Sequence, residues 1–170
     1  MKNLWAPWRM EYITSAKKPT AECIFEAAAG EPFSKQDLIL YRDRLVSVLI
    51  NRFPYANGHL LVAPVRHLPE PEDLSETENS AIMRMLQQCI SILRATLRPQ
   101  GFNVGLNLGT AAGAGLADHL HWHIVPRWDG DHNFIAVVGE IRTIPEHLET
   151  TFDKLLPAFQ LLLDNQPKTS

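Results

Sequence analysis

The sequence predicts an α+β fold, in which an antiparallel sheet is combined with a long central helix and a C-terminal helix. Two observations predict it: short apolar runs bounded by turn-forming residues, and two longer segments with apolar residues at helical spacing. They follow one another as strands, helix, strands and helix. The chain has 170 residues, of which 45% are hydrophobic. This composition suffices for a substantial core, so we expect one domain over residues 1–170.

Four strands are expected. Residues 45–50 and 59–64 are apolar runs, and the segment 51–58 between them is rich in turn-forming residues. Residues 102–108 and 119–126 form a second pair, which follows the central helix. The order of strands, then helix, then strands favours an antiparallel sheet.

The central helix is predicted by its start, its apolar stripe and its end. Ser75 and Glu78 have the spacing of a capping box, and the helix should end before Pro99. Its stripe consists of Ile82, Met85, Leu86, Cys89 and Leu93. Cys89 is therefore most simply a core residue. The C-terminal helix should be disturbed at Pro157. Its stripe consists of Leu148, Phe152, Leu155, Leu156 and Phe159.

Charge and cysteine content exclude several classes of protein. The formal net charge of −3 provides no global basic field, so we expect no nucleic-acid partner and local groups to hold any anion. No apolar stretch approaches membrane-spanning length, and residues 1–9 lack the apolar core of a signal peptide, so we expect no membrane partner and a cytoplasmic location. Cys23 and Cys89 do not make a disulfide framework. We expect residues 1–20 to form an aromatic arm and residues 166–170 a frayed tail.

Three histidines at strict alternation are the main functional signal. Successive side chains of a strand point to opposite faces, so the imidazoles of His119, His121 and His123 should line one face. The residues that alternate with them and follow them are bulky or apolar: Leu120, Trp122, Ile124 and Val125. Imidazole acts as nucleophile, acid, base or metal ligand near neutral pH. Three imidazoles on one face of a strand indicate a reactive surface rather than a purely structural role in packing.

A glycine-rich segment, residues 107–118, leads into these histidines. Glycine lets the backbone approach a ligand closely, and successive backbone N–H groups can form an anion-binding nest. The residues expected to contribute to this nest are Asn107, Gly109, Thr110, Gly113 and Gly115. Together with the histidines, the segment indicates a phosphate held against a nucleophile.

The run His119–Val125 resembles the signature of the histidine triad (HIT) family, in which three histidines alternate with apolar residues. Residues 51–64 resemble the family's first strand pair on the nucleotide side, and residues 65–67 resemble the segment that usually follows this pair. Residues 4–9 and 126–128, with Asn133 and Phe134, resemble a bacterial branch of diadenosine-polyphosphate phosphorylases and hydrolases. The resemblance covers about residues 4–135.

The resemblance implies a HIT-like fold and roles for individual residues. His121 would attack the α-phosphorus and form a nucleotidyl-imidazole intermediate, with its other ring nitrogen bonded to a backbone carbonyl. His123 would contact phosphate oxygens and assist the leaving group. Asn51 would contact the ribose, and His59 would approach the triad across the sheet. Asn107 and the 109–115 loop would hold the phosphates.

These roles define the predicted function. The protein would be a nucleotide-binding enzyme that cleaves a nucleoside polyphosphate at the α-phosphate, as a diadenosine tetraphosphate phosphorylase of the ATP adenylyltransferase type. A dinucleoside polyphosphate or nucleoside phosphoramidate hydrolase is the alternative within the family. The chemistry requires no cofactor. Family members pair their sheets into a twofold dimer, and Trp5, Trp8 and Tyr12 add apolar surface, so we expect a homodimer.

Two departures from the family pattern bear on this prediction. Many members carry glutamine or serine just before the triad, where this chain has residues 113–116, Gly-Ala-Gly-Leu. Zinc-bearing members have Cys-x-x-Cys where this chain has Cys23 and Glu26, and their two histidine ligands match His67 and His119. A structural zinc site with these four ligands is one interpretation. The other is that zinc has been lost and Cys23 is an ordinary thiol, which leaves His119 free to join the phosphate-facing group.

Two further classes of protein remain as hypotheses. In a metalloenzyme, His119, His121 and His123 would together hold a catalytic zinc, although the carboxylates that usually orient such histidines are not evident beyond Asp118. In a regulator, the chain would bind a nucleotide without turnover. Metal analysis distinguishes the zinc enzyme from an enzyme with a histidine nucleophile. Trapping a phosphoramidate on His121 distinguishes an enzyme with that nucleophile from a regulator without turnover.

Overall fold

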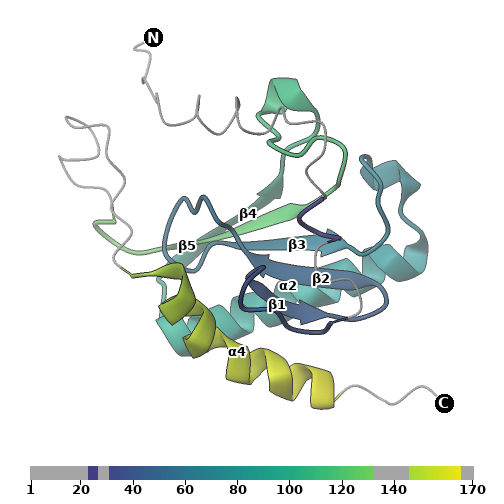
Figure 1. The fold of residues 1–170 in the computed structure, drawn as a ribbon. Helices are drawn as coiled ribbons and strands as arrows, with labels where there is room; N and C mark the ends of the chain where they lie inside the picture. The colour runs from purple at the N-terminus through teal and green to yellow at the C-terminus, as the bar shows by residue number, and fades with distance from the viewer. Residues whose placement is uncertain (1–22, 27–30, 132–145, 166–170) are drawn as a thin grey trace, which may run out of the picture.

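The computed structural model describes residues 23–26, 31–131 and 146–165 (Figure 1). One five-stranded sheet in the order β1-β2-β3-β5-β4 forms its centre, and every neighbouring pair is antiparallel. The strands are β1 (Ile39–Arg42), β2 (Val46–Ile50), β3 (Leu60–Pro64), β4 (Gly101–Leu106) and β5 (Trp122–Arg127). The helices are α2 (Glu76–Leu97) and α4 (Leu148–Asp164), and the 3₁₀ turns are η1 (Pro71–Asp73) and η2 (Thr110–Ala112). The predicted α+β class is confirmed.

Helix α2 packs across one face of the sheet and contributes five residues to the main apolar core (Figure 1). Its capping box is formed: Ser75 accepts from the backbone N–H of Glu78, and the Glu78 carboxylate accepts from that of Ser75. The helix ends at Leu97, because Arg98 takes a left-handed conformation with φ 52° just before Pro99. All five residues of the predicted apolar stripe are buried. Burying such side chains contributes roughly 1.5–3 kcal/mol each.

Helix α4 packs against α2 and against β1 at the edge of the sheet (Figure 1). It buries Phe152, Leu155 and Phe159, as the stripe predicts. The helix continues through Pro157 to Asp164, so the proline does not end it. Pro157 lies on the exposed side, where water can satisfy the backbone carbonyl that the proline leaves without a donor.

Strand β1 was not predicted from the sequence. All four of its residues are buried, so it shows no alternation of apolar and polar positions. It contains a bulge between Ile39 and Tyr41, which further obscures the pattern.

Two predicted strands differ from the structure by more than one residue at one end. Strand β4 ends at Leu106 rather than at residue 108, before the chain turns at Gly109 with φ 70°. Strand β5 begins at Trp122 rather than at residue 119, so His119 and His121 precede the ladder and only His123 lies in it. The physical reason is local: the backbone N–H of Leu120 donates to the Leu68 carbonyl, 2.7 Å away, which lies outside the sheet.

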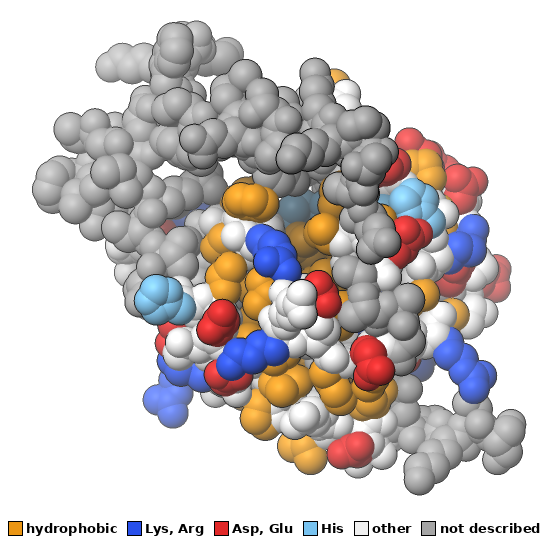
Figure 2. Space-filling view, viewed as in Figure 1, with side chains coloured by type: hydrophobic (Ala, Val, Ile, Leu, Met, Phe, Trp, Pro, Cys, Tyr) orange, Lys and Arg blue, Asp and Glu red, His pale blue; other side chains and the backbone are white. Residues whose placement is uncertain are grey.

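Several sequence predictions concern residues outside the described part of the chain. These are the aromatic arm with Trp5, Trp8 and Tyr12, the tail 166–170, and Phe134. Among the described residues, neither helix combines the length and apolar character needed to cross a bilayer. On the face drawn in Figure 2, acidic and basic side chains are interspersed with apolar ones over the described residues.

Candidate functional site

The three histidine side chains lie on the face of the sheet opposite α2. Ile124 packs into the core under α2, whereas the rings of His119 and His121 contact Phe25, which belongs to a separate apolar cluster on the other face. His123 follows them along β5, and its ring contacts that of His121 at 5.0 Å between centroids. The predicted alternation therefore holds, although the ladder begins only at Trp122.

His121 has the hydrogen bonding and burial that a nucleophilic imidazole requires. Its Nδ1 donates to the backbone carbonyl of His119 at 2.8 Å, and since a carbonyl only accepts, the proton resides on Nδ1. The lone pair is thus left on Nε2. The side chain is buried, and burial lowers the pKa of His121, which keeps the ring neutral near pH 7. This geometry matches what the resemblance implied for a nucleophile.

A chain of hydrogen bonds fixes the protonation of His123. The backbone N–H of Tyr55 donates to Nδ1 of His59 at 3.0 Å, and the Asn51 amide nitrogen lies 3.3 Å from the same atom. His59 therefore carries its proton on Nε2, which lies 3.0 Å from Nδ1 of His123. His123 accepts there, so its own proton is on Nε2. Burial, with a smaller effect of His121, lowers the pKa of His123 to about 4.

The hairpin between β2 and β3 positions these donors. Gly58 has φ 71°, and a Cβ at this position would lie 2.5 Å from the Leu97 side chain, so the tight approach to α2 requires glycine here. The side-chain oxygen of Asn51 accepts from the backbone N–H of Phe53. In this structure the amide of Asn51 thus supports His59 and the hairpin turn.

The glycine-rich loop lies beyond the end of β4. Asn107 follows Leu106, the last residue of β4, which pairs with Trp122. Gly109 and Gly113 both take positive φ values, 70° and 87°. The backbone N–H groups of Ala112, Gly113 and Ala114 donate within the loop. They are therefore not available for a simple anion nest.

Other members of the predicted phosphate-binding set remain accessible. Thr110 is exposed and Gly115 is half-buried. Within the described chain, no hydrogen bond joins this loop to the three imidazoles.

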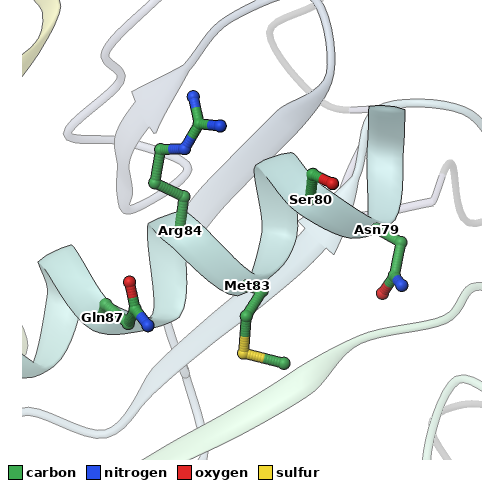
Figure 3. Close-up of a pocket in the computed structure, with 5 residues that line it drawn as sticks. All are labelled: Asn79, Ser80, Met83, Arg84 and Gln87. Atoms are coloured by element: carbon green, nitrogen blue, oxygen red, sulfur yellow. The ribbon is translucent and has the colours of Figure 1, made fainter. Parts of the chain in front are cut away.

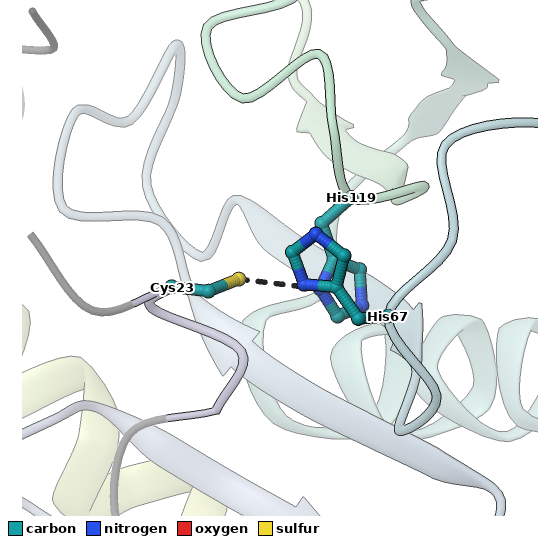
Figure 4. A group of neighbouring side chains, drawn as sticks. All are labelled: Cys23, His67 and His119. Carbon is teal, nitrogen blue, oxygen red and sulfur yellow. Dashed lines mark hydrogen bonds between the residues drawn. The ribbon is translucent and has the colours of Figure 1, made fainter. Parts of the chain in front are cut away.

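Cys23, His67 and His119 form a cluster beside the triad, with one potential ligand atom from each within 4.8 Å of the others (Figure 4). The Cys23 Sγ lies 3.2 Å from Nδ1 of His119, and Nε2 of His119 donates to the Pro64 carbonyl at 2.9 Å. Nδ1 of His119 is therefore unprotonated and able to accept a thiol proton or bind a metal. Burial raises the pKa of the Cys23 thiol.

Glu26 lies outside this group of three. Its carboxylate accepts from Nδ1 of His67 at 3.1 Å. A carboxylate on the far nitrogen of a metal-binding histidine is a common way to orient that histidine.

A separate shallow hollow lies along the exposed side of α2 (Figure 3). It is lined by Asn79, Ser80, Met83, Arg84 and Gln87. All of these come from one helix and none is a histidine, so the hollow is distinct from the triad site.

Three contributors to the site were not singled out in the sequence. Phe25 packs against two of the imidazoles, Tyr55 fixes the His59 tautomer through its backbone, and Pro64 accepts from His119. Two of these act through main-chain atoms, which residue type does not reveal. The position of Phe25 between Cys23 and Glu26 was the available signal for its role.

His121 is bonded at Nδ1, and its Nε2 atom carries the lone pair. An antiparallel sheet that presents such an imidazole is typical of proteins that transfer a group through a histidine nucleophile. The HIT domain family model matches residues 33–130. An AP-4-A phosphorylase from Mycobacterium tuberculosis is 41% identical over 161 residues, which cover 89% of this chain and 80% of that protein. The chain therefore belongs to the HIT family, and it is an enzyme of the nucleotidyltransferase or hydrolase kind.

Other relatives agree with this assignment. A bis(5'-adenosyl)-triphosphatase from Dictyostelium discoideum is 29% identical, over 79% of this chain and 92% of that protein. The crystal structure of a Zn-bound histidine triad family protein from Mycobacterium smegmatis matches with a TM-score of 0.60 and 26% identity, over 76% of this chain and 88% of that one.

Proposed function

We propose that this enzyme is a diadenosine tetraphosphate phosphorylase, which cleaves its substrate at an α-phosphate through a nucleotidyl intermediate on His121. The observation that carries the proposal is the bond from His121 Nδ1 to the His119 carbonyl, which leaves Nε2 as the attacking atom. The 41% identity to the mycobacterial AP-4-A phosphorylase supports the choice of substrate.

In the first step, the lone pair on Nε2 of His121 attacks the α-phosphorus. The bond from that phosphorus to the bridging oxygen breaks, and ATP leaves. The oxygen that departs gains negative charge, and His123 Nε2–H is the donor suited to it, because His59 occupies the opposite nitrogen.

In the second step, an oxygen of inorganic phosphate attacks the adenylyl phosphorus. The bond to Nε2 of His121 breaks, the imidazole regains its lone pair, and ADP is the product. Asn107, Thr110 and the remaining N–H groups of the 109–115 loop would hold phosphate oxygens. Asn51 would contact the ribose, which requires its amide to share or exchange its bond to His59.

We also propose a structural zinc ion at Cys23, His67 and His119. One thiolate and two imidazoles are ligands that zinc prefers, and the unprotonated Nδ1 of His119 fits this use. Glu26 would be the fourth ligand, and this requires its carboxylate to turn away from His67. Zinc there would supply local stability, and it takes no part in the steps above.

A homodimer is the proposed assembly. Strand β4 is an edge of the sheet, with Val104 44% exposed, whereas the opposite edge strand β1 is buried beside α4. No described residue pairs with the outer side of β4, and such an edge offers backbone groups to a second copy of the chain.

Product analysis with diadenosine tetraphosphate tests the proposed reaction. The substrate is incubated with and without ³²P-labelled inorganic phosphate, and nucleotides are separated. We expect phosphate to accelerate cleavage and the label to appear in ADP. Release of AMP and ATP at a rate indifferent to phosphate would identify a hydrolase. Adenosine phosphoramidate in a parallel reaction tests the remaining alternative within the family.

A further inference from the structure

The turn 51–58 between β2 and β3 carries two exposed aromatic side chains. Phe53 is 59% exposed and Tyr55 is 41% exposed, whereas every other Phe, Tyr or Trp that the structure describes is buried or half-buried. Exposed apolar side chains that gather beside a reactive site often mark a surface that contacts a ligand. An aromatic ring is suited to a planar ligand, which it can stack against.

The Tyr55 ring lies beside His123. The two rings are nearly parallel, at 18°, with 5.8 Å between their centroids, and the Tyr55 ring also lies 4.6 Å from that of His59. Ring contacts thus lead from His121 to His123 and from His123 to Tyr55. Tyr55 is therefore next to the histidine that faces the leaving group in the proposed reaction.

The turn that carries Tyr55 is held in place from both sides. The backbone N–H of Tyr55 donates to Nδ1 of His59 at 3.0 Å. Further along the turn, the side-chain oxygen of Asn57 lies 3.0 Å from the buried hydroxyl of Thr151 in α4. A ring on a turn held in this way is preorganised, so little conformational freedom is lost when a ligand stacks on it.

The leaving group of the proposed reaction has a part that such a ring can bind. When the bond at the α-phosphorus breaks, the departing ATP carries an adenine at the far end of a flexible triphosphate chain. That chain begins at the oxygen facing His123, beside Tyr55. Stacking of a base on an aromatic side chain typically strengthens binding by about fivefold or more.

We propose that Tyr55 is a specificity-determining residue, whose ring stacks on the base of the leaving nucleotide. The enzyme would then prefer dinucleoside polyphosphates to mononucleoside polyphosphates, because only the former have a second base to stack. The inference rests on the proposed function, since His123 defines the side on which the leaving group lies.

A matched pair of ligands tests the proposal. Diadenosine tetraphosphate and adenosine tetraphosphate are each used with a methylene group in place of every α,β-bridging oxygen, so that neither is cleaved and they differ in the second nucleoside. Calorimetry gives the Kd of each. We expect Tyr55→Leu to raise the Kd of the diadenosine analogue by about fivefold or more and to change that of the other analogue by less than about twofold.

Two control variants accompany this measurement. Tyr55→Trp keeps an aromatic ring and should retain tight binding of the diadenosine analogue. Met83→Ala removes an apolar side chain that is 54% exposed on α2, across the sheet from the imidazoles, and should change neither Kd. An equal rise of both Kd values in Tyr55→Leu would mean that Tyr55 acts on the phosphates or on His123, and two unchanged values would mean that the second base binds elsewhere. Either result would overturn the proposal.

The test separates this inference from the proposed function, because binding is measured without turnover. If His121→Ala retained activity, covalent catalysis by His121 would fail, while the two Kd values would still decide whether Tyr55 contacts the second base. Conversely, full activity that depends on His121, together with equal effects of Tyr55→Leu on both analogues, would leave the function standing and reject the role of Tyr55.

Discussion

The Nε2 atom of His59 lies 3.0 Å from the Nδ1 atom of His123, and the backbone N–H of Tyr55 determines the direction of the hydrogen bond between them. His59 has to donate because its other nitrogen already accepts. The consequence is that His123 presents an N–H at Nε2, which can donate a hydrogen bond to the oxygen of a leaving group as its negative charge develops.

Replacing His59 should therefore impair the leaving-group step. We expect His59→Leu to lower kcat by roughly 10²-fold, the effect of losing one oriented donor to a developing oxyanion. His59→Gln, which keeps a side-chain donor, should recover part of the loss. Steady-state kinetics measures both. His147→Leu, the same change at an exposed residue before α4, should leave the rate unchanged. A normal rate in His59→Leu would show that His123 needs no such partner.

His121→Ala should abolish turnover and leave nucleotide binding largely intact, because loss of a covalent nucleophile costs orders of magnitude in rate. Single-turnover kinetics and calorimetric binding of a non-hydrolysable analogue measure the two effects. Retention of more than about a tenth of the wild-type rate would rule out covalent catalysis by His121.

Purified protein should contain about one zinc per chain, and Cys23→Ala should lose it. Chelation should lower the melting temperature more than it slows the chemistry, since a site filled by protein ligands acts on folding. Glu26→Cys should hold the metal more tightly than wild type, because thiolate is the softer ligand. Metal analysis and thermal melts test this prediction. Metal-free protein whose melting is unaffected by chelator would refute the site.

Acid should destabilise the fold through the buried histidines. The pKa of His123 is lowered from 6.5 to about 4, and those of His119 and His121 are also lowered. Between pH 6.5 and 4 the unfolded chain binds protons that the folded chain does not, so the free energy of unfolding falls as the pH falls through this window. Urea titrations at several pH values measure it. His123→Gln should reduce the slope, and an unchanged slope would contradict this assignment.

Light scattering at micromolar concentration should give the mass of a dimer. Val104→Asp, on the exposed edge strand β4, should shift the mass toward that of a monomer, because a charge at a strand edge opposes pairing. Leu161→Asp on α4, where the leucine is 63% exposed, serves as the matched control and should leave the mass unchanged. A monomeric mass for the wild-type protein would reject the dimer.

The fold class, the central helix and the triad follow from patterns in the amino-acid sequence. These rest on local chemistry: the capping box at Ser75, the apolar stripe of α2 and the alternation of His119, His121 and His123 all act over a few residues. The family followed from the same short motif. Strand β1 escaped prediction because it is buried on both faces and has no alternation for a pattern to detect.

The protonation and the orientation of the imidazoles depend on contacts that form in the folded protein. The tautomer of His59 depends on a backbone N–H in the hairpin, and His119 accepts from Cys23, 96 residues away, only because its other nitrogen meets the Pro64 carbonyl. The type of a residue does not predict which main-chain hydrogen bonds it forms or which residues it contacts across the sheet. The same holds for Phe25, whose place against His121 arises from packing between segments far apart in the chain.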